Sequence, residues 1–143
     1  LDKATELKLD HVVNIQNTDL KDYVNSITNG YGANVVLECS GAVPAAKQGL
    51  DILRKKGQYV QVGIFKDPEI SFDLEKIIQK EIRMVGTRSQ KPDDWEPSLQ
   101  LLSSGDVNAE ALVTNELDIT QWEEGYNHIK GGEGIKVLLR PID

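Results

Sequence analysis

Three short segments combine a hydrophobic strand pattern with a glycine at its end: Cys39-Ser40-Gly41, Val62-Gly63-Ile64 and Val85-Gly86-Thr87. The carboxyl ends of parallel strands share one edge of a sheet, which is where open α/β sheets bind their ligands. Glycine at such an edge lets the backbone approach a ligand with no Cβ in the way. A single glycine of this kind is better explained as a strand terminator. Three together indicate a site for a long, flat ligand along the edge.

Side chains that could bind a metal are few and lie far apart. His11 and His128 have no Cys-x-x-Cys or His-x-x-x-His pattern near them, and Cys39 is the one cysteine. Zinc sites need several such ligands at characteristic spacings, so we predict no metal site and no catalytic residue within this chain alone. We expect His11 to open a strand, His128 to lie on a solvated helix face, and Cys39 to be a small buried apolar residue.

The composition is that of a soluble globular chain with an acidic balance. Its 143 residues include 16 Lys and Arg against 23 Asp and Glu, for a net charge of −7. This charge argues against nucleic acid or an anionic membrane as a partner, and no apolar run reaches membrane-spanning length. The basic run Arg54-Lys55-Lys56 is predicted to be the last turn of a helix, where cations offset the helix dipole. One cysteine cannot form an internal disulfide, which favours the cytoplasm.

Helical and strand patterns alternate along the chain. Apolar residues at helical spacing predict helices that include residues 19–28, with Thr18 as the cap, 44–56, a short helix capped by Asp73, one from Trp95 to Gly105, and one begun by a capping box at 120–123. Strand patterns are predicted at 11–14, 34–38, 58–62, 82–85, 111–114 and 135–139, with a brief extended piece at 69–72. This alternation predicts an α/β fold with a parallel sheet.

The strand ends carry a resemblance to a known family. The segments GYGANVVLECSGA, LRKKGQYVQVGIF and ISFDLEKIIQKEIRMVGTRS resemble the second half of the nucleotide domain of zinc-dependent medium-chain alcohol dehydrogenases, and within them the polyol branch of sorbitol and L-iditol dehydrogenases. The resemblance implies that residues 1–90 are the second half of an NAD(P)-binding Rossmann domain. It also implies that residues 91–143 are a linking helix and the C-terminal strand-helix-strand return of a GroES-like catalytic domain.

The resemblance also implies roles for individual residues. Ser40 and Gly41 are expected beside the ribose and adenine side of NAD. Val62, Gly63 and Ile64 are expected against the nicotinamide and its ribose, and Thr87 and Arg88 at the carboxamide through backbone groups. The implied reaction is hydride transfer from a secondary alcohol or polyol to NAD, with a zinc ion polarising the alcohol.

Two parts of the family pattern are absent from these 143 residues. The Gly-x-Gly-x-x-Gly phosphate turn and the zinc ligands are not found, and the Gly131–Gly134 segment lacks the strand-to-helix context of a phosphate turn. We therefore expect a C-terminal fragment of a longer enzyme, inactive by itself. Two alternatives stay open at this point: a zinc-free quinone reductase of the same superfamily, and a small α/β binding module that is complete as it stands.

A Rossmann sheet without its first two strands must close its open edge in some way. We expect the 11–14 strand to slide beside residues 35–37, which gives a four-stranded sheet with its bare face covered by the C-terminal elements or a partner chain. The extended piece at 69–72 is expected to pair with its own copy and form a homodimer or tetramer, because the matching strand does so in the family.

Overall fold

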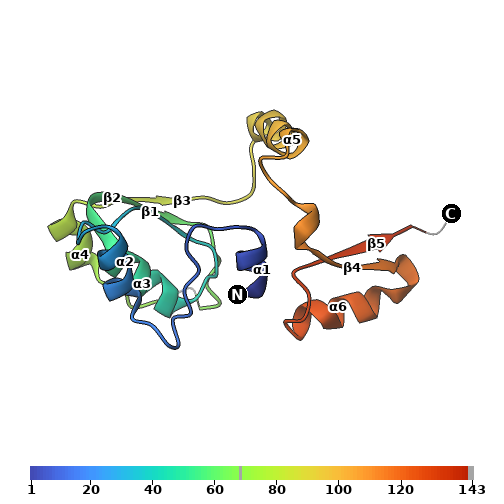
Figure 1. Ribbon diagram of the computed structural model, residues 1–143, viewed down its shortest axis with the longest axis horizontal. Coiled ribbons are helices and arrows are strands. Elements are labelled where there is room, and N and C mark those ends of the chain that lie inside the picture. Colours follow the sequence, from blue (N-terminus) through green and yellow to red (C-terminus); the bar gives the residue numbers. More distant parts are fainter. Residues whose placement is uncertain (68, 142–143) are drawn as a thin grey trace. The chain divides into compact units, whose positions relative to one another are not determined.

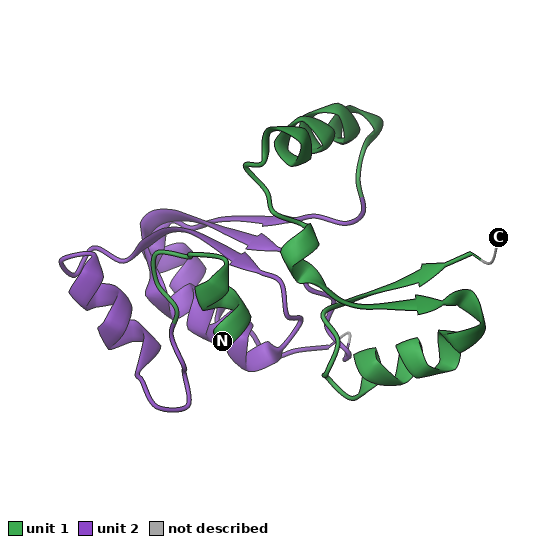
Figure 2. Ribbon diagram, turned by 45° about the vertical axis from the view of Figure 1, so that its right-hand side comes forward, with its two compact units in different colours: residues 1–12, 90–143 green, residues 13–89 purple. Residues whose placement is uncertain are grey.

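The computed structural model describes residues 1–67 and 69–141, which fall into two compact units (Figure 2). The sheet unit is residues 13–89, and the terminal unit is residues 1–12 together with 90–143. The helices are α1 (Asp2–Glu6), α2 (Leu20–Ile27), α3 (Val43–Ile52), α4 (Leu74–Lys80), α5 (Trp95–Ser104) and α6 (Trp122–Lys130). The strands are β1 (Ala33–Glu38), β2 (Leu53–Gln61), β3 (Arg83–Gly86), β4 (Val113–Asp118) and β5 (Lys136–Arg140).

The sheet unit is built on a parallel three-stranded sheet in the order β1-β2-β3. Helices α2, α3 and α4 lie on one side of it (Figure 1). The core forms between this layer and the sheet, where Ala46 and Leu50 of α3 pack with Leu53, Tyr59 and Ile82. The parallel α/β architecture predicted from the sequence is confirmed.

Glycine allows α3 to approach the sheet closely. A Cβ on Gly49 would lie 3.0 Å from Val36 Cγ1 and 3.1 Å from the Tyr59 ring. These two side chains are partners in the β1–β2 register, so one glycine faces both strands. Phe72 completes this part of the core through a T-shaped contact with Tyr59, in which the ring centroids are 6.1 Å apart.

The predicted four-stranded sheet is wrong for the described residues. Residues 11–14 lie outside any strand, and a turn follows them in which the Asn14 side chain accepts a hydrogen bond from the Gln16 amide at 3.0 Å. The sheet therefore begins at β1, and the strand expected to slide beside it does not do so. Val35 and Leu37 of β1 stay 54% and 63% exposed.

The predicted end of the 44–56 helix is also wrong. Helix α3 ends at Ile52, and the basic run belongs to the first half of β2, where the register jumps between the pairs Ala33–Leu53 and Val35–Gln58. Leu53 leaves the helical conformation and becomes buried. The cation that satisfies the end of α3 is Lys80 of α4, whose Nζ donates to the carbonyls of Leu50, Asp51 and Leu53 at 2.8 Å each.

The terminal unit contains a second parallel pair, β4 and β5, joined through α6. Gly125 is the buried residue of α6 and faces Val137 and Leu139 of β5. The capping box precedes its predicted place and is formed by Asp118 and Gln121 around a short 3₁₀ turn. Helix α5 closes as predicted at Gly105, which has a φ of 79°.

Of the two predicted single-residue helix caps, one is confirmed and one is wrong. Asp73 caps α4 as expected, whereas α2 is capped by Asp19, whose carboxylate accepts from the Asp22 amide at 2.9 Å, and not by Thr18. Residues 69–72 lie outside any helix or strand. None of the described helices is both long and apolar enough to cross a membrane.

Candidate functional site

The carboxyl ends of β2 and β3 enclose a surface hollow of about 300 Å³. Five of the seven residues that the sequence nominated line it: Val62, Gly63, Ile64, Thr87 and Arg88. Its other lining residues are Gln61, Gly86 and Ser89. Parallel pairing in register brings these segments together, because Gln61 and Gly86 are partners at the ends of their strands. We call this edge, together with Ser40 and Gly41, the rim.

Backbone hydrogen bonds fix the rim from strand to strand. The Val62 and Gly63 amides both donate to the Glu38 carbonyl at 2.8 Å, which connects the end of β2 to the end of β1. The Thr87 amide donates to the Gln61 carbonyl at 3.0 Å, which connects the end of β3 to β2. The Thr87 N–H is therefore already used within the chain.

Gly41 lies against Gly63, and the Glu38 carboxylate connects the loop of Ser40 and Gly41 to the end of β2 through Gln61. The Glu38 side chain accepts from the Ser40 amide at 2.8 Å, from the Ser40 hydroxyl, and from the Gly41 amide at 3.0 Å. It also accepts from the side-chain nitrogen of Gln61, Nε2, at 2.5 Å. The loops that follow β1 and β2 thus share one buried anion.

The pKa of Glu38 reflects this environment. Burial by itself raises the pKa, but hydrogen bonds from the side chains of Ser40 and Gln61 and from the Ser40 and Gly41 amides outweigh it, so the pKa is lowered. The carboxylate remains ionised at neutral pH although Glu38 is only 4% exposed. Burial, and secondly the charge of Glu38, raise the pKa of Tyr59 to about 12, so its hydroxyl is a permanent donor.

Gly63 and Gly86 differ in the space that surrounds them. A Cβ on Gly63 would lie 2.1 Å from the Gly41 amide nitrogen and 2.7 Å from Glu38 Oε2, so its space is filled by the chain itself. A Cβ on Gly86 would meet nothing within 4 Å. Gly63 is required by packing between two loops, whereas Gly86 opens onto the hollow and leaves room there for a ligand.

Comparison with known proteins agrees with this geometry. The family model described as zinc-binding dehydrogenase matches residues 1–104. The chain belongs to the zinc-binding dehydrogenase family. It is 62% identical over all 143 residues to a sorbitol dehydrogenase of Halalkalibacterium halodurans, and covers 42% of that protein. It is 40% identical over 136 residues, or 95% of its length, to a D-arabitol-phosphate dehydrogenase of Enterococcus avium, and covers 39% of that protein.

The fold of the chain also matches solved structures. The crystal structure of 2R,3R-butanediol dehydrogenase from Bacillus subtilis superposes on 99% of the chain with a TM-score of 0.85 at 26% identity, and the match covers 40% of that structure. The chain therefore spans about two fifths of the length of the relatives it matches. The Rossmann-like resemblance inferred from the strand ends is confirmed.

The described part of the chain does not offer a zinc site. No group of three His, Cys, Asp or Glu residues in residues 1–67 and 69–141 is placed to hold a metal. His128 lies on α6 with Nδ1 3.2 Å from Glu133 Oε2. Cys39 is exposed rather than buried, because β1 pairs on one side only and leaves its other edge uncovered. No zinc step can be built on these residues.

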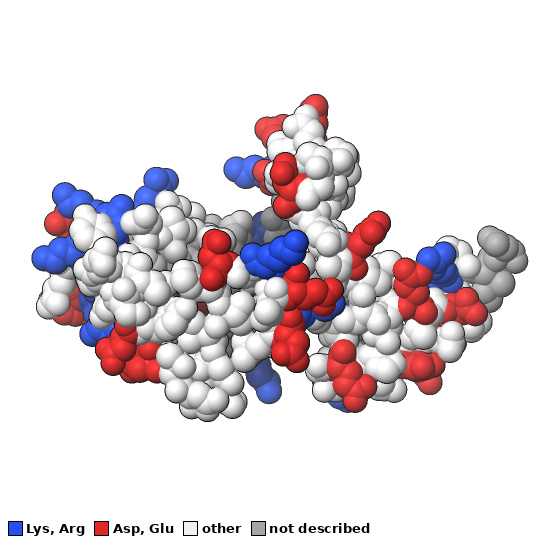
Figure 3. All heavy atoms as spheres, in the orientation of Figure 1, with Lys and Arg blue, Asp and Glu red and all other residues white. Residues whose placement is uncertain are grey.

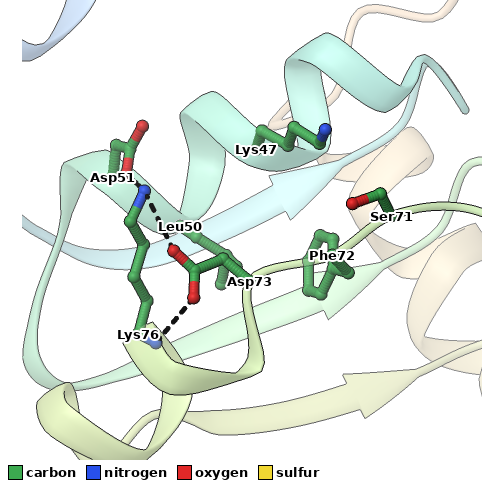
Figure 4. A pocket seen from close by; sticks show the side chains of 7 residues that line it. All are labelled: Lys47, Leu50, Asp51, Ser71, Phe72, Asp73 and Lys76. Carbon is green, nitrogen blue, oxygen red and sulfur yellow. Dashed lines mark hydrogen bonds and ion pairs between the residues drawn. The ribbon is translucent and has the colours of Figure 1, made fainter.

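A second hollow, of about 460 Å³, lies between α3 and residues 71–76 (Figure 4). Its Lys76 is already paired with Asp51 and, at 3.6 Å, with Asp73. Hydrogen bonding to Asp51 is the main reason that the pKa of Lys76 is raised. This hollow has no contact with the strand ends, and we do not assign the cofactor to it.

Charge is distributed unevenly over the sheet unit. Lys and Arg side chains gather at the end that carries α4, on the left of Figure 3. The strands run away from that end toward the rim (Figure 1). The rim itself contributes one cationic side chain, Arg88, to its hollow. A ligand at the rim is therefore met mainly by backbone and apolar groups.

Sequence reasoning overlooked the residues that organise the rim. Glu38 stands inside an apolar strand, and a buried carboxylate must find donors nearby, so its presence there was a usable signal. Gln61 gave no signal, since its role depends on residues 23 positions earlier in the chain. Gly86 was recognised as a strand-end glycine but was not among the residues expected to contact the cofactor.

Proposed function

We propose that the rim binds the nicotinamide half of NAD in an alcohol or polyol dehydrogenase. The observation that carries the proposal is the hollow at the ends of β2 and β3, which opens at Gly86 and is lined by the apolar side chains of Val62 and Ile64. When bound, the dinucleotide supplies the hydride acceptor. Val62 and Ile64 exclude water from it, while the Thr87 carbonyl and the Arg88 segment orient its polar group. Ser40 and Gly41 flank its ribose and adenine side.

We further propose that these residues act within a longer polypeptide that provides the phosphate turn, the zinc ligands and the alcohol site. Relatives that are more than twice as long, and the exposed Val35 and Leu37 on the open side of the sheet, support this. Residues 1–90 then belong to the cofactor domain and residues 91–143 to the return into the catalytic domain. A division of the chain between Ser89 and Gln90 lies beside this border.

A chimera tests the proposal. The 143 residues replace the matching segment of the H. halodurans sorbitol dehydrogenase, to which they are 62% identical. The chimera should bind NAD and oxidise a polyol, while the 143-residue chain alone should show negligible to weak NAD affinity in calorimetry and no activity. A folded chimera that binds no dinucleotide would overturn the assignment.

Gly86→Val locates the site within the chimera. A Cβ at this position would meet no atom within 4 Å, so stability should hold while NAD affinity falls about tenfold or more through loss of space. The control is Lys55→Val, an exposed change at the opposite ends of the strands. Equal NAD affinity in the Gly86→Val and unaltered chimeras would place the cofactor elsewhere.

We also propose a cytoplasmic homodimer or tetramer joined through residues 69–72. The support is that this segment lies outside the sheet of its own chain, and an extended segment of this kind can pair with a copy. Sedimentation of the chimera should show an assembly that Ser71→Pro weakens. A Ser71→Pro protein that keeps the assembly intact argues for another interface.

A further inference from the structure

Glu38 is the one buried charged side chain among the residues that the structure describes. It stands at the end of β1, and nothing in the proposed binding of NAD uses it directly. Its two carboxylate oxygens accept hydrogen bonds from Ser40, Gly41 and Gln61. Burying a carboxylate costs free energy unless hydrogen-bond donors surround it, so the placing of these donors around Glu38 calls for an explanation.

The carboxylate fills the space between two loops of the rim. A Cβ on Gly63 would meet Glu38 Oε2 at 2.7 Å, and one on Gly41 would meet the Ile64 carbonyl oxygen at 2.2 Å. The loops after β1 and β2 therefore touch, with Glu38 between them. A change in this one side chain would move Ser40 and Gly41 relative to Gly63 and Ile64.

A second chain of hydrogen bonds connects Glu38 to the core. The Tyr59 hydroxyl donates to Gln61 Oε1 at 2.7 Å, and Gln61 Nε2 donates both to Glu38 and to the Gly63 carbonyl at 2.7 Å. Tyr59 is fully buried. Because the Gln61 oxygen is occupied by the Tyr59 donor, its NH₂ group must face Glu38, and the position of the carboxylate is set by the core.

We propose that Glu38 is a positioning residue that, as a carboxylate, holds the Ser40–Gly41 and Val62–Gly63 loops at the spacing that NAD requires. This inference rests on the proposed function of the rim. The negative charge matters because every group that meets the carboxylate is a donor. A neutral amide in its place would turn an NH₂ group toward one of those donors and push the loops apart.

The test compares Glu38→Gln with the unaltered chimera. The expected result is a rise of about 10- to 100-fold in the NAD dissociation constant, from the loss of charged hydrogen bonds, with kcat at saturating NAD and the KM for the polyol within about twofold. Glu38→Asp keeps the charge and should recover part of the affinity. Glu81→Gln, which removes an exposed carboxylate, is the control and should change nothing.

A merely structural role predicts a different pattern. Loss of folded protein would lower kcat in proportion and leave the NAD dissociation constant of the remaining enzyme unchanged, and that result overturns the inference. Equal NAD affinity in the Glu38→Gln and unaltered chimeras overturns it as well. Failure of the unaltered chimera to bind NAD would instead reject the proposed function.

Amide hydrogen exchange in the 143-residue chain gives a readout that needs no cofactor. Glu38→Gln should speed exchange at the Ser40 and Gly41 amides by about tenfold or more, because the neutral amide keeps one acceptor oxygen in place of two and its NH₂ group disturbs the loop, while the amides of α6 stay as they were. If the Glu38→Gln chimera does not fold, this comparison and the Glu38→Asp chimera decide. Unchanged exchange at Ser40 and Gly41 would show that Glu38 does not hold the loop.

Discussion

The molecule contains the same connection twice, and the two copies differ in what supports them. In the sheet unit, β1, α3 and β2 form a parallel strand-helix-strand unit, as β4, α6 and β5 do in the terminal unit. Helix α3 buries Ala46, Gly49 and Leu50, whereas α6 buries only Gly125. The apolar side chains of α6 stay at the surface, with Trp122 and Tyr126 55% and 62% exposed.

The difference explains why we assign a site to the first copy and not to the second. The first is backed by a third strand and by α4, so the ends of its strands are held by a core and can be arranged to a ligand. The second has two strands and one helix, and two-stranded sheets are marginal in water without something to pack on. Its exposed apolar face is consistent with the proposed return into a separate domain.

The largest expected effect breaks the core that only the sheet unit has. Leu50→Ala removes a side chain that is 1% exposed and should lower the free energy of unfolding of this unit by about 2–5 kcal/mol. Leu139→Ala, at a residue 42% exposed in β5, is the matched control and should cost about 1 kcal/mol or less.

The two tryptophans make the units separately visible in a urea titration. Trp95 and Trp122 both lie in the terminal unit, so tryptophan fluorescence reports on it alone, while far-UV circular dichroism reports on both units. Leu50→Ala should shift the circular dichroism transition and leave the fluorescence transition in place. If the two transitions move together, the units unfold as one and the contrast drawn between them does not hold.

The second prediction sharpens the contrast between two glycines of the rim. Gly63→Ala forces a Cβ against the Gly41 amide and Glu38, and should cost about 1–3 kcal/mol. Gly86→Ala meets nothing within 4 Å and should stay within about 0.5 kcal/mol. Thermal unfolding followed by circular dichroism measures both. Equal stability of the two variants would mean that the loops after β1 and β2 yield without resistance.

These glycines also show how far the sequence alone could lead. The apolar run that ends at Glu38 and the glycines after β2 and β3 predicted strands and a common edge, because strand pattern and strand ends are local properties. That Gly63 faces the chain and Gly86 faces open space depends on which loop lies opposite. That information lies in the pairing of β1 with β2 and not in either segment.

The wrong predictions also concern contacts between segments that lie far apart in the sequence. The run Arg54-Lys55-Lys56 looks like a helix end because cations suit one, but the end of α3 is satisfied by Lys80 from a later helix. Residues 11–14 have a strand pattern, yet a strand also needs a partner to pair with. These residues do not pair with the edge of β1. Glu38 inside an apolar strand indicated that donors must lie nearby, but its partner Gln61, 23 positions later in the chain, could not be predicted from the sequence.

The third prediction tests the distant cap of α3. Lys80→Met removes three hydrogen bonds to the carbonyls at the end of α3 and should lower the stability of the sheet unit by about 1–2 kcal/mol. Burial lowers the pKa of Lys80, so the ammonium is held at some cost and the net loss should stay in this range. Lys55→Met, at an exposed position of the basic run, should be neutral. If Lys55→Met costs more, the local run caps the helix after all.

The smallest expected effect lies in the terminal unit, where Arg140 of β5 reaches across to Glu116 of β4. Arg140 Nε donates to Glu116 Oε2 at 2.9 Å, and a second guanidinium nitrogen also reaches that oxygen. Both side chains are exposed, 68% and 45%, so solvent and salt screen the pair.

Arg140→Met should therefore shift the fluorescence-detected urea transition by about 0.2–1 kcal/mol, and by less in high salt. Glu116→Gln should cost a similar amount, and the double variant little more than either, because each change removes the same interaction. A loss above about 2 kcal/mol would mean that this pair holds β4 and β5 together as the core holds β1 and β2. In that case the terminal unit would have a support of its own, made of charge rather than of buried side chains.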